Sequence, residues 1–222
     1  MTAFGQTHLL TLIIIFGLAA VLIFFGRRGA KWPTIFLAWM TFSTFAANQA
    51  AYASLDYPVA LDNILPFHLC DVVAIICGFA LLTKKRGLCE LAYLWGLTGT
   101  IQGLVTPNMP YGPDHPVYWS FFLQHGSIVI VALFIPLAMR WRPDRGTFWR
   151  VFLWGQIYFF GALAINHFLG TNFGFLREKP RVASVLDYFG DWPTYLIGIQ
   201  IFALVAYLIL LLPFAQHLRK KK

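Results

Sequence analysis

Seven long runs of apolar residues, separated by short polar stretches, divide the chain. They span Thr7–Phe25, Trp32–Tyr52, Leu65–Thr83, Leu88–Val105, Pro116–Met139, Trp149–Gly170 and Pro193–Phe214. Each run approaches the roughly 20 residues that a helix needs to cross a bilayer. None shows the apolar–polar alternation that is typical of strands in a membrane β-barrel. The pattern predicts an all-α, polytopic membrane bundle of seven transmembrane helices, which forms one domain over residues 1–222.

The basic residues are distributed unevenly between these runs. Three of the 17 follow the sixth run: Arg177, Lys179 and Arg181. The other 14 follow the first, third, fifth and seventh runs: Arg27, Arg28, Lys31, Lys84, Lys85, Arg86, Arg140, Arg142, Arg145, Arg150, Arg219, Lys220, Lys221 and Lys222. By the positive-inside rule, the N-terminus lies outside and the C-terminus lies in the cytoplasm. This distribution explains the net charge of +8, so we expect no nucleic-acid partner.

Composition supports a membrane location, because 59% of residues are hydrophobic and only 12% are charged. A soluble domain has about 25% charged residues. The first run lacks a basic stretch before it and has one after it. This order argues against a cleaved signal peptide and favours a retained helix. We therefore expect a multi-pass integral membrane protein.

Polar residues inside the runs gather toward one end of the predicted bundle. With the topology above, the outer half holds Asn48, Gln49, His68, Cys70, Asp71, Gln102, Gln124, His125, Asn166, His167 and Asn172. Ionisable groups at membrane depth are rare and usually face a cavity or a partner. We therefore expect one polar cavity in the outer half. The loop Thr171–Trp192 is long enough to fold over it as a lid or short helix.

Cys70 is the candidate nucleophile of this cavity. Pro66 suits a first helical turn, so Cys70 would lie about one turn from the helix start, where the helix dipole favours a thiolate. His125 is the candidate base, because His68 at i−2 points away from Cys70. Asp71 or Gln124 would orient the imidazole, with His68 and Gln102 in support. A cysteine and a histidine within hydrogen-bond reach suffice for acyl transfer. Each polar residue also has a structural reading, as hydrogen-bonding between helices or as packing.

Four motifs carry a resemblance to a known family. They are Leu65-Pro-Phe-His-Leu-Cys-Asp71, Gln124-His125-Gly126, Asn166-His-Phe-Leu-Gly-Thr-Asn-Phe173 and Leu186-Asp-Tyr-Phe-Gly-Asp-Trp-Pro193. Their order and spacing resemble the YwaF family of bacterial integral membrane proteins. That family is similar to the vertebrate transmembrane acyltransferase that makes arachidonoyl ether phosphatidylethanolamine, and more distantly to the androgen-induced lipid hydrolases.

The resemblance implies a multi-pass protein of a bacterial plasma membrane, and a transacylase that moves an acyl chain between membrane phospholipids. It maps the catalytic pair of the acyltransferase onto Cys70 and His125. We expect the substrate to contact Asn48, Asn166, Asn172 and Asp187, and we expect no cofactor.

Two other functions fit the same residues. A zinc-dependent membrane hydrolase could take its metal ligands from His68, Asp71, His125 and His167. A non-enzymatic carrier could hold a lipid or another small molecule in the outer cavity. The sequence leaves the acyl donor, the acceptor and the oligomeric state open.

Overall fold

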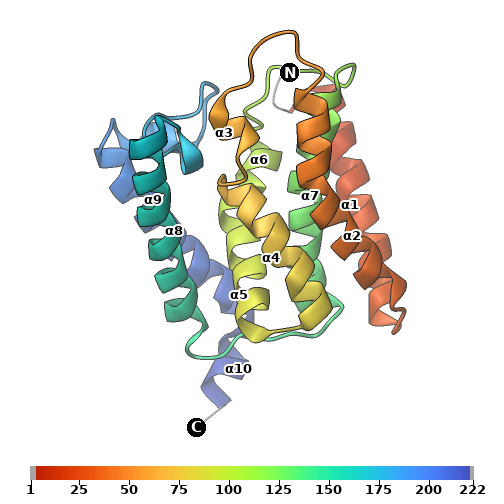
Figure 1. The fold of residues 1–222 in the computed structure, drawn as a ribbon. Helices are drawn as coiled ribbons and strands as arrows, with labels where there is room; N and C mark the ends of the chain where they lie inside the picture. The colour runs from red at the N-terminus through yellow and green to blue at the C-terminus, as the bar shows by residue number, and fades with distance from the viewer. Residues whose placement is uncertain (1–3, 221–222) are drawn as a thin grey trace.

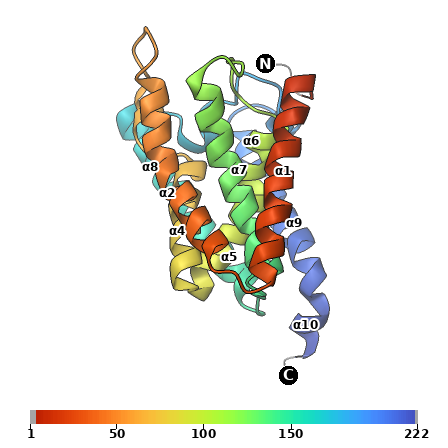
Figure 2. The same cartoon turned by 90° about the vertical axis from the view of Figure 1, so that its right-hand side faces the viewer.

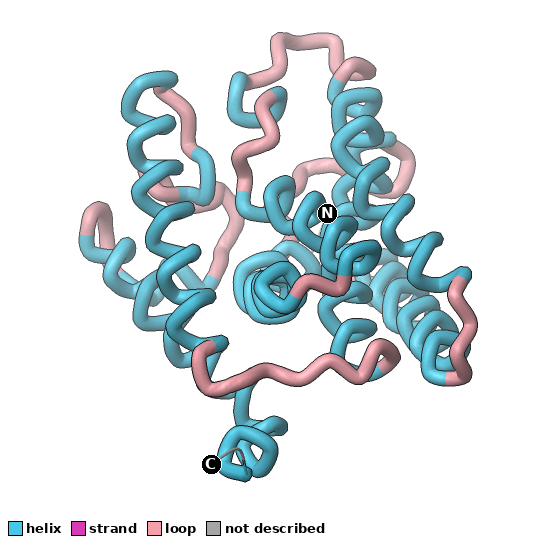
Figure 3. The backbone as a smooth tube through the Cα atoms, turned by 60° about the horizontal axis from the view of Figure 1, so that its bottom comes forward, coloured by secondary structure: helices cyan, strands magenta, loops and turns pink. Residues whose placement is uncertain are grey.

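The computed structural model describes residues 4–220, and every regular element among them is a helix (Figures 1 and 3). The long elements are α1 (Gln6–Arg27), α2 (Trp32–Tyr52), α4 (Leu69–Thr83), α5 (Arg86–Trp95), α7 (Pro116–Leu137), α8 (Thr147–Leu169) and α9 (Thr194–Leu211). The short elements are α3 (Leu61–Ile64), η1 (Gly96–Thr100), α6 (Ile101–Val105), η2 (Phe173–Phe175), η3 (Val185–Phe189), η4 (Leu212–Phe214) and α10 (Ala215–Lys220). The predicted all-α class is confirmed for the described residues.

Five helices of the described chain are long and apolar enough to cross a membrane. They occupy Gln6–Arg27, Leu61–Thr83, Pro116–Leu137, Thr147–Leu169 and Thr194–Leu218. The other two predicted spans coincide with α2 and with the continuous segment α5–η1–α6. α2 is less apolar because it carries Thr41, Ser43 and Thr44, whose hydroxyls donate to carbonyls of their own helix. The fold therefore supports a multi-pass membrane protein, and the full count of seven spans stays a prediction.

α7 forms the centre of the bundle, and most of its length is buried. It packs against α1, α2, α4 and α5. α8 and α9 stand to one side of this group (Figure 1). Their outer faces expose large apolar side chains: Trp149, Leu153, Trp154, Ile157, Phe160, Ile197, Ile201, Val205 and Leu208. Such surfaces suit contact with lipid tails, which explains why these two helices need little burial within the protein.

Two predicted spans contain breaks that the hydrophobic pattern did not reveal. The third begins at Leu69 rather than Leu65, and Pro66 lies in the turn before it. The prediction that Pro66 opens the helix is therefore wrong. The fourth runs through a wide π-helical turn, η1, between α5 and α6. Both breaks border the cavity described below, and π-helical turns frequently occur at functional sites.

The two described ends of the chain lie at opposite ends of the bundle (Figures 1 and 2). The α1–α2, α4–α5 and α7–α8 connections lie at the same end as α10 (Figures 1 and 2). The basic residues that follow the first, third and fifth apolar runs belong to these connections or to the helix ends beside them. Those that follow the seventh run begin within α10. Lys221 and Lys222 lie outside the described residues.

Ion pairs join α5 to α8 at this basic end. Glu90 is 1% exposed and accepts hydrogen bonds from Arg150 Nε and Thr147 Oγ1, both at 2.9 Å. Asp144 accepts from Arg150 Nη2 at 2.6 Å and also pairs with Arg86. The buried carboxylate of Glu90 is thus compensated, as a charge at this depth requires. The network attaches α8 to the bundle at this end.

Candidate functional site

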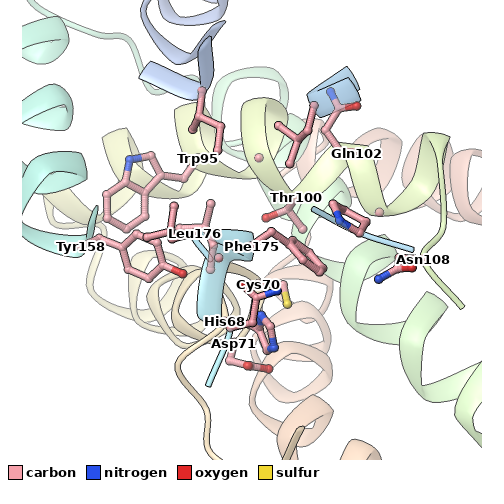
Figure 4. Close-up of a pocket in the computed structure, with 18 of the residues that line it drawn as sticks. His68, Cys70, Asp71, Trp95, Thr100, Gln102, Asn108, Tyr158, Phe175 and Leu176 are labelled. Carbon is pink, nitrogen blue, oxygen red and sulfur yellow. The ribbon is translucent and has the colours of Figure 1, made fainter. Parts of the chain in front are cut away.

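A cavity of about 740 Å³ runs between α8 and α9 on one side and the rest of the bundle on the other. Its polar part is lined by residues from α2, α4, α6 and α7, and its deeper part by Trp95, Phe152 and Tyr207. Figure 4 shows His68, Cys70 and Asp71 grouped on one wall, with Thr100 and Gln102 on the wall facing them. The cavity is lined by these members of the predicted site: Asn48, Gln49, His68, Cys70, Asp71, Gln102, Gln124, His125 and Asn172.

Cys70 is a free cysteine and the second residue of α4. His68 precedes the helix, and its carbonyl accepts from the backbone N–H groups of Asp71 and Val72 at 3.0 and 3.2 Å. Cys70 is therefore nearer to the helix start than the sequence indicated. Its place in the first turn puts Cys70 beside backbone N–H groups that have no partner within the helix.

His125 lies in the middle of α7 and is held by Phe121, one turn earlier. Its Nδ1 is 2.9 Å from the Phe121 carbonyl oxygen. The two rings stack with centroids 4.1 Å apart. A carbonyl oxygen only accepts hydrogen bonds, so Nδ1 carries the proton. In the neutral imidazole, Nε2 then keeps a lone pair that can accept a proton.

Gln124 joins two other helices rather than orienting His125. Its amide nitrogen donates to Asp71 Oδ1 at 2.6 Å, and its amide oxygen accepts from Asn48 Nδ2 at 3.1 Å. These contacts connect α2, α7 and α4. We expected Asp71 or Gln124 to orient the imidazole; the structure places the Phe121 carbonyl oxygen at Nδ1 instead. Asn48 and Gln124 thus form hydrogen bonds between helices, which was the structural alternative for these residues.

Cys70 and His125 face the same cavity from neighbouring helices. α4 packs against α7, and both side chains line the cavity. Among the described residues, the hydrogen bonds of His125 do not include one to Cys70. Catalytic hydrogen bonds are often long or absent without substrate. The two side chains thus line one cavity, and the described hydrogen bonds do not join them directly.

The loop between α8 and α9 covers one side of the cavity, as predicted. Phe173 and Phe175 of η2 contact the His68 ring, with centroids 5.2 and 5.9 Å apart. Asn166 is buried and binds both backbone groups of Phe173, at 2.7 and 2.9 Å. Asn172 lines the cavity, but its side-chain oxygen already accepts from the backbone of Arg177 at 3.0 Å. These residues hold the loop in place over His68.

Three predicted site residues lie away from the cavity wall. Asn166 holds the loop, as just described. Asp187 accepts from the backbone of Ser184 at 2.7 Å and caps η3. His167 is exposed beside Phe168. The contacts proposed between these residues and a substrate stay predictions.

The alternative zinc ligands are only partly assembled. His68, Asp71 and His125 line the cavity, whereas His167 does not. Within residues 4–220, no group of three or more histidine, cysteine, aspartate or glutamate side chains is arranged to hold a metal ion. The geometry gives the zinc alternative no direct support.

Of the wall formed by η1 and α6, the sequence analysis identified only Gln102. Thr98, Gly99, Thr100 and Gly103 all line the cavity. A Cβ added at Gly99 would collide with Leu69, and one added at Gly103 would collide with the His125 ring. These glycines allow the segment to lie close to both α4 and α7. The run Gly96-Leu-Thr-Gly-Thr-Ile-Gln-Gly103 was the available signal, since glycine within a helix often marks a close approach.

A family model described as the TMEM164 family matches residues 3–211. No curated protein and no solved structure matches the chain. The family match covers every residue that lines the cavity. The likeness to the YwaF family in particular stays a prediction. With nearly its whole length matched, the chain belongs to the TMEM164 family.

Proposed function

We propose that this protein is an integral membrane lipid acyltransferase, or a lipid hydrolase, that uses Cys70 as nucleophile and His125 as general base. One observation carries the proposal: a free cysteine at a helix start and a histidine with a fixed Nδ1 share one cavity within an apolar bundle. Membership of the TMEM164 family is consistent with acyl transfer to ether lipids.

The reaction proceeds in two steps. His125 Nε2 accepts the thiol proton while Cys70 Sγ attacks the ester carbonyl of a donor phospholipid. The ester C–O bond then breaks, the leaving oxygen takes the proton from His125, and a thioester remains on Cys70. In the second step a hydroxyl of an acceptor lipid gives its proton to His125 and attacks the thioester carbonyl; the C–S bond breaks and Cys70 Sγ takes the proton from His125, which restores the thiol. Water in place of the acceptor would give hydrolysis.

The cavity lining suits a phospholipid. Phe152, Phe159 and Ile199 supply apolar surface for an acyl chain. Lys179 and Arg181 line the cavity within the α8–α9 loop. Three basic residues lie outside the groups that follow the first, third, fifth and seventh apolar runs, and Lys179 and Arg181 are two of these three. A phosphate headgroup would be drawn to these two cations, while its chains reach the deeper, apolar part.

We further propose seven membrane crossings, with the N-terminus outside and the C-terminus in the cytoplasm. The support is the gathering of basic residues at the C-terminal end of the bundle. The cavity then lies toward the outer leaflet of a bacterial-type plasma membrane, where it would meet its lipid substrates.

The decisive experiment replaces Cys70 and, as a matched control, Cys77 of the same helix. Cys70→Ala should abolish lipid turnover, and Cys70→Ser should lose most of it because a hydroxyl ionises far less readily than a thiol. Cys77 is fully buried away from the cavity, so Cys77→Ala should retain turnover at a modest cost in stability. Mass spectrometry of lipids from expressing cells measures both effects.

The same assay separates the other functions. A fully active Cys70→Ala protein would overturn the proposed mechanism. Loss of bound zinc together with activity in His68→Ala and Asp71→Asn, with Cys70→Ala still active, would indicate the metal hydrolase. A carrier would bind lipid without turnover in the wild type and in every variant.

A further inference from the structure

Thr98 and Thr100 carry buried hydroxyl groups that have no partner. Among the described residues, only three buried side-chain polar atoms lack a hydrogen bond, and two of them are Thr98 Oγ1 and Thr100 Oγ1. The two residues are 5% and 3% exposed and both line the cavity. A hydroxyl group buried without a partner destabilises the folded state, so such groups usually mark a place where a ligand or water binds.

The wide turn of η1 accounts for the missing partners. A threonine in an α-helix commonly donates to a carbonyl three or four residues earlier. Thr41 and Thr44 do so in α2, at 3.0 and 2.8 Å. In η1 the π-helical turn shifts those carbonyls out of register. The hydroxyls of Thr98 and Thr100 are thus left free for another acceptor.

Thr100 belongs to a segment that approaches both the residue before Cys70 and the ring of His125. Its neighbour Gly99 abuts Leu69, the residue before Cys70. Gly103, three residues on, abuts the His125 ring. Residues at i and i+3 lie on neighbouring parts of a helix surface. Figure 4 shows Thr100 on the wall that faces Cys70. Thr98 lies two positions away and therefore points in a different direction.

We propose that the Thr100 hydroxyl binds the carbonyl oxygen of the ester that Cys70 attacks. This inference rests on the proposed acyl transfer. When sulfur bonds to the carbonyl carbon, the electron pair of the C=O π bond moves to oxygen, which becomes negative. Thr100 donates a hydrogen bond to that oxygen and keeps its own proton. The charge returns when the C=O bond re-forms and the ester C–O bond breaks. A donor aimed at this oxygen stabilises the transition state more than the ground state.

The test compares Thr100→Val with Thr100→Ser and Thr44→Val. Valine has nearly the shape of threonine but no hydroxyl. Thr100→Val should lower ester turnover by about 10²-fold, the typical loss of one such donor. Thr100→Ser should stay within a few-fold of the wild type. Thr44→Val should keep turnover, because Thr44 does not line the cavity.

Two further measurements separate a catalytic effect from a structural one. Thr100→Val removes an unpaired hydroxyl, so its apparent Tm should be unchanged or higher, whereas Thr44→Val loses a hydrogen bond and should melt lower. Alkylation of Cys70 by iodoacetamide forms no oxyanion, so its rate in Thr100→Val should equal that of the wild type.

The outcomes distinguish this inference from the function on which it rests. Wild-type turnover in Thr100→Val, with Cys70→Ala inactive, would overturn the role of Thr100 and leave the mechanism standing. A lower Tm or slower alkylation in Thr100→Val would also overturn it, since the hydroxyl would then support the structure. An active Cys70→Ala protein would remove both the mechanism and the inference.

Discussion

Gly103→Ala tests the geometry around His125 most directly. The added Cβ would lie within 3.0 Å of three atoms of the His125 ring, closer than non-bonded carbon atoms approach. The ring cannot turn aside freely, because Phe121 both stacks on it and accepts its Nδ1 proton. The substitution therefore forces either the imidazole or α6 to move.

The size of the effect follows from these contacts. Losing the hydrogen bond to Phe121 costs about 0.5–1.5 kcal/mol net. Disturbing the stacked ring pair costs about 0.5–1.5 kcal/mol. Overpacking a dense site typically costs about 1–3 kcal/mol. Because the surrounding residues can shift around the added methyl group, each of these costs is partly relieved. We therefore expect the free energy of unfolding to fall by about 2 kcal/mol. A base displaced by about 1 Å should also lower turnover by roughly 10²-fold.

Gly161→Ala in α8 is the matched control. A Cβ at Gly161 would meet no atom within 4 Å. Alanine in a helix is favoured over glycine by about 0.5–1 kcal/mol, so this variant should be as stable as the wild type or slightly more so. Thermal unfolding in detergent measures stability, and lipid mass spectrometry measures turnover. If Gly103→Ala matched Gly161→Ala in both assays, the close contact between α6 and His125 would be refuted.

Three further predictions concern other parts of the molecule. Gln124→Leu leaves Asp71 and Asn48 without their shared partner and should cost about 1–3 kcal/mol in stability; an unchanged thermal transition would contradict the contact between these helices. Partial burial raises the pKa of Asp144, but hydrogen bonds from Arg150 and Gly146 and the charges of Arg150 and Arg86 lower it overall, below its ordinary 3.8. The ionised Asp144 therefore stabilises the folded state above its ordinary pKa, and this stabilisation is lost as pH falls through the lowered pKa. Asp144→Asn should thus lower the Tm at pH 6 and have a smaller effect near pH 3. An equal loss at both pH values would exclude the ionic contribution. A tag after residue 222 should be protected from protease added to intact cells, and a tag before residue 1 should be cleaved; a protected N-terminal tag would contradict the odd number of crossings.

The sequence determined the helical class, the approximate ends of the long helices and part of the polar group that lines the cavity. It did so because a helix in a membrane must be apolar over a fixed length, so any polar residue within it stands out. His68, Cys70, Asp71, Gln124 and His125 were identified in this way, and all of them line the cavity.

Only the tertiary structure decided which groups contact one another. Gln124 binds Asp71 and Asn48 instead of His125, because residues that share one cavity still approach in directions set by helix packing. The Phe121 carbonyl orients the imidazole, and no pattern of side chains predicts a backbone acceptor. The free hydroxyl of Thr100 depends on a π-helical turn, which shifts the hydrogen-bond register without changing the hydrophobic pattern. The composition of the site is thus a local property of the sequence, whereas its contacts follow from how the helices pack.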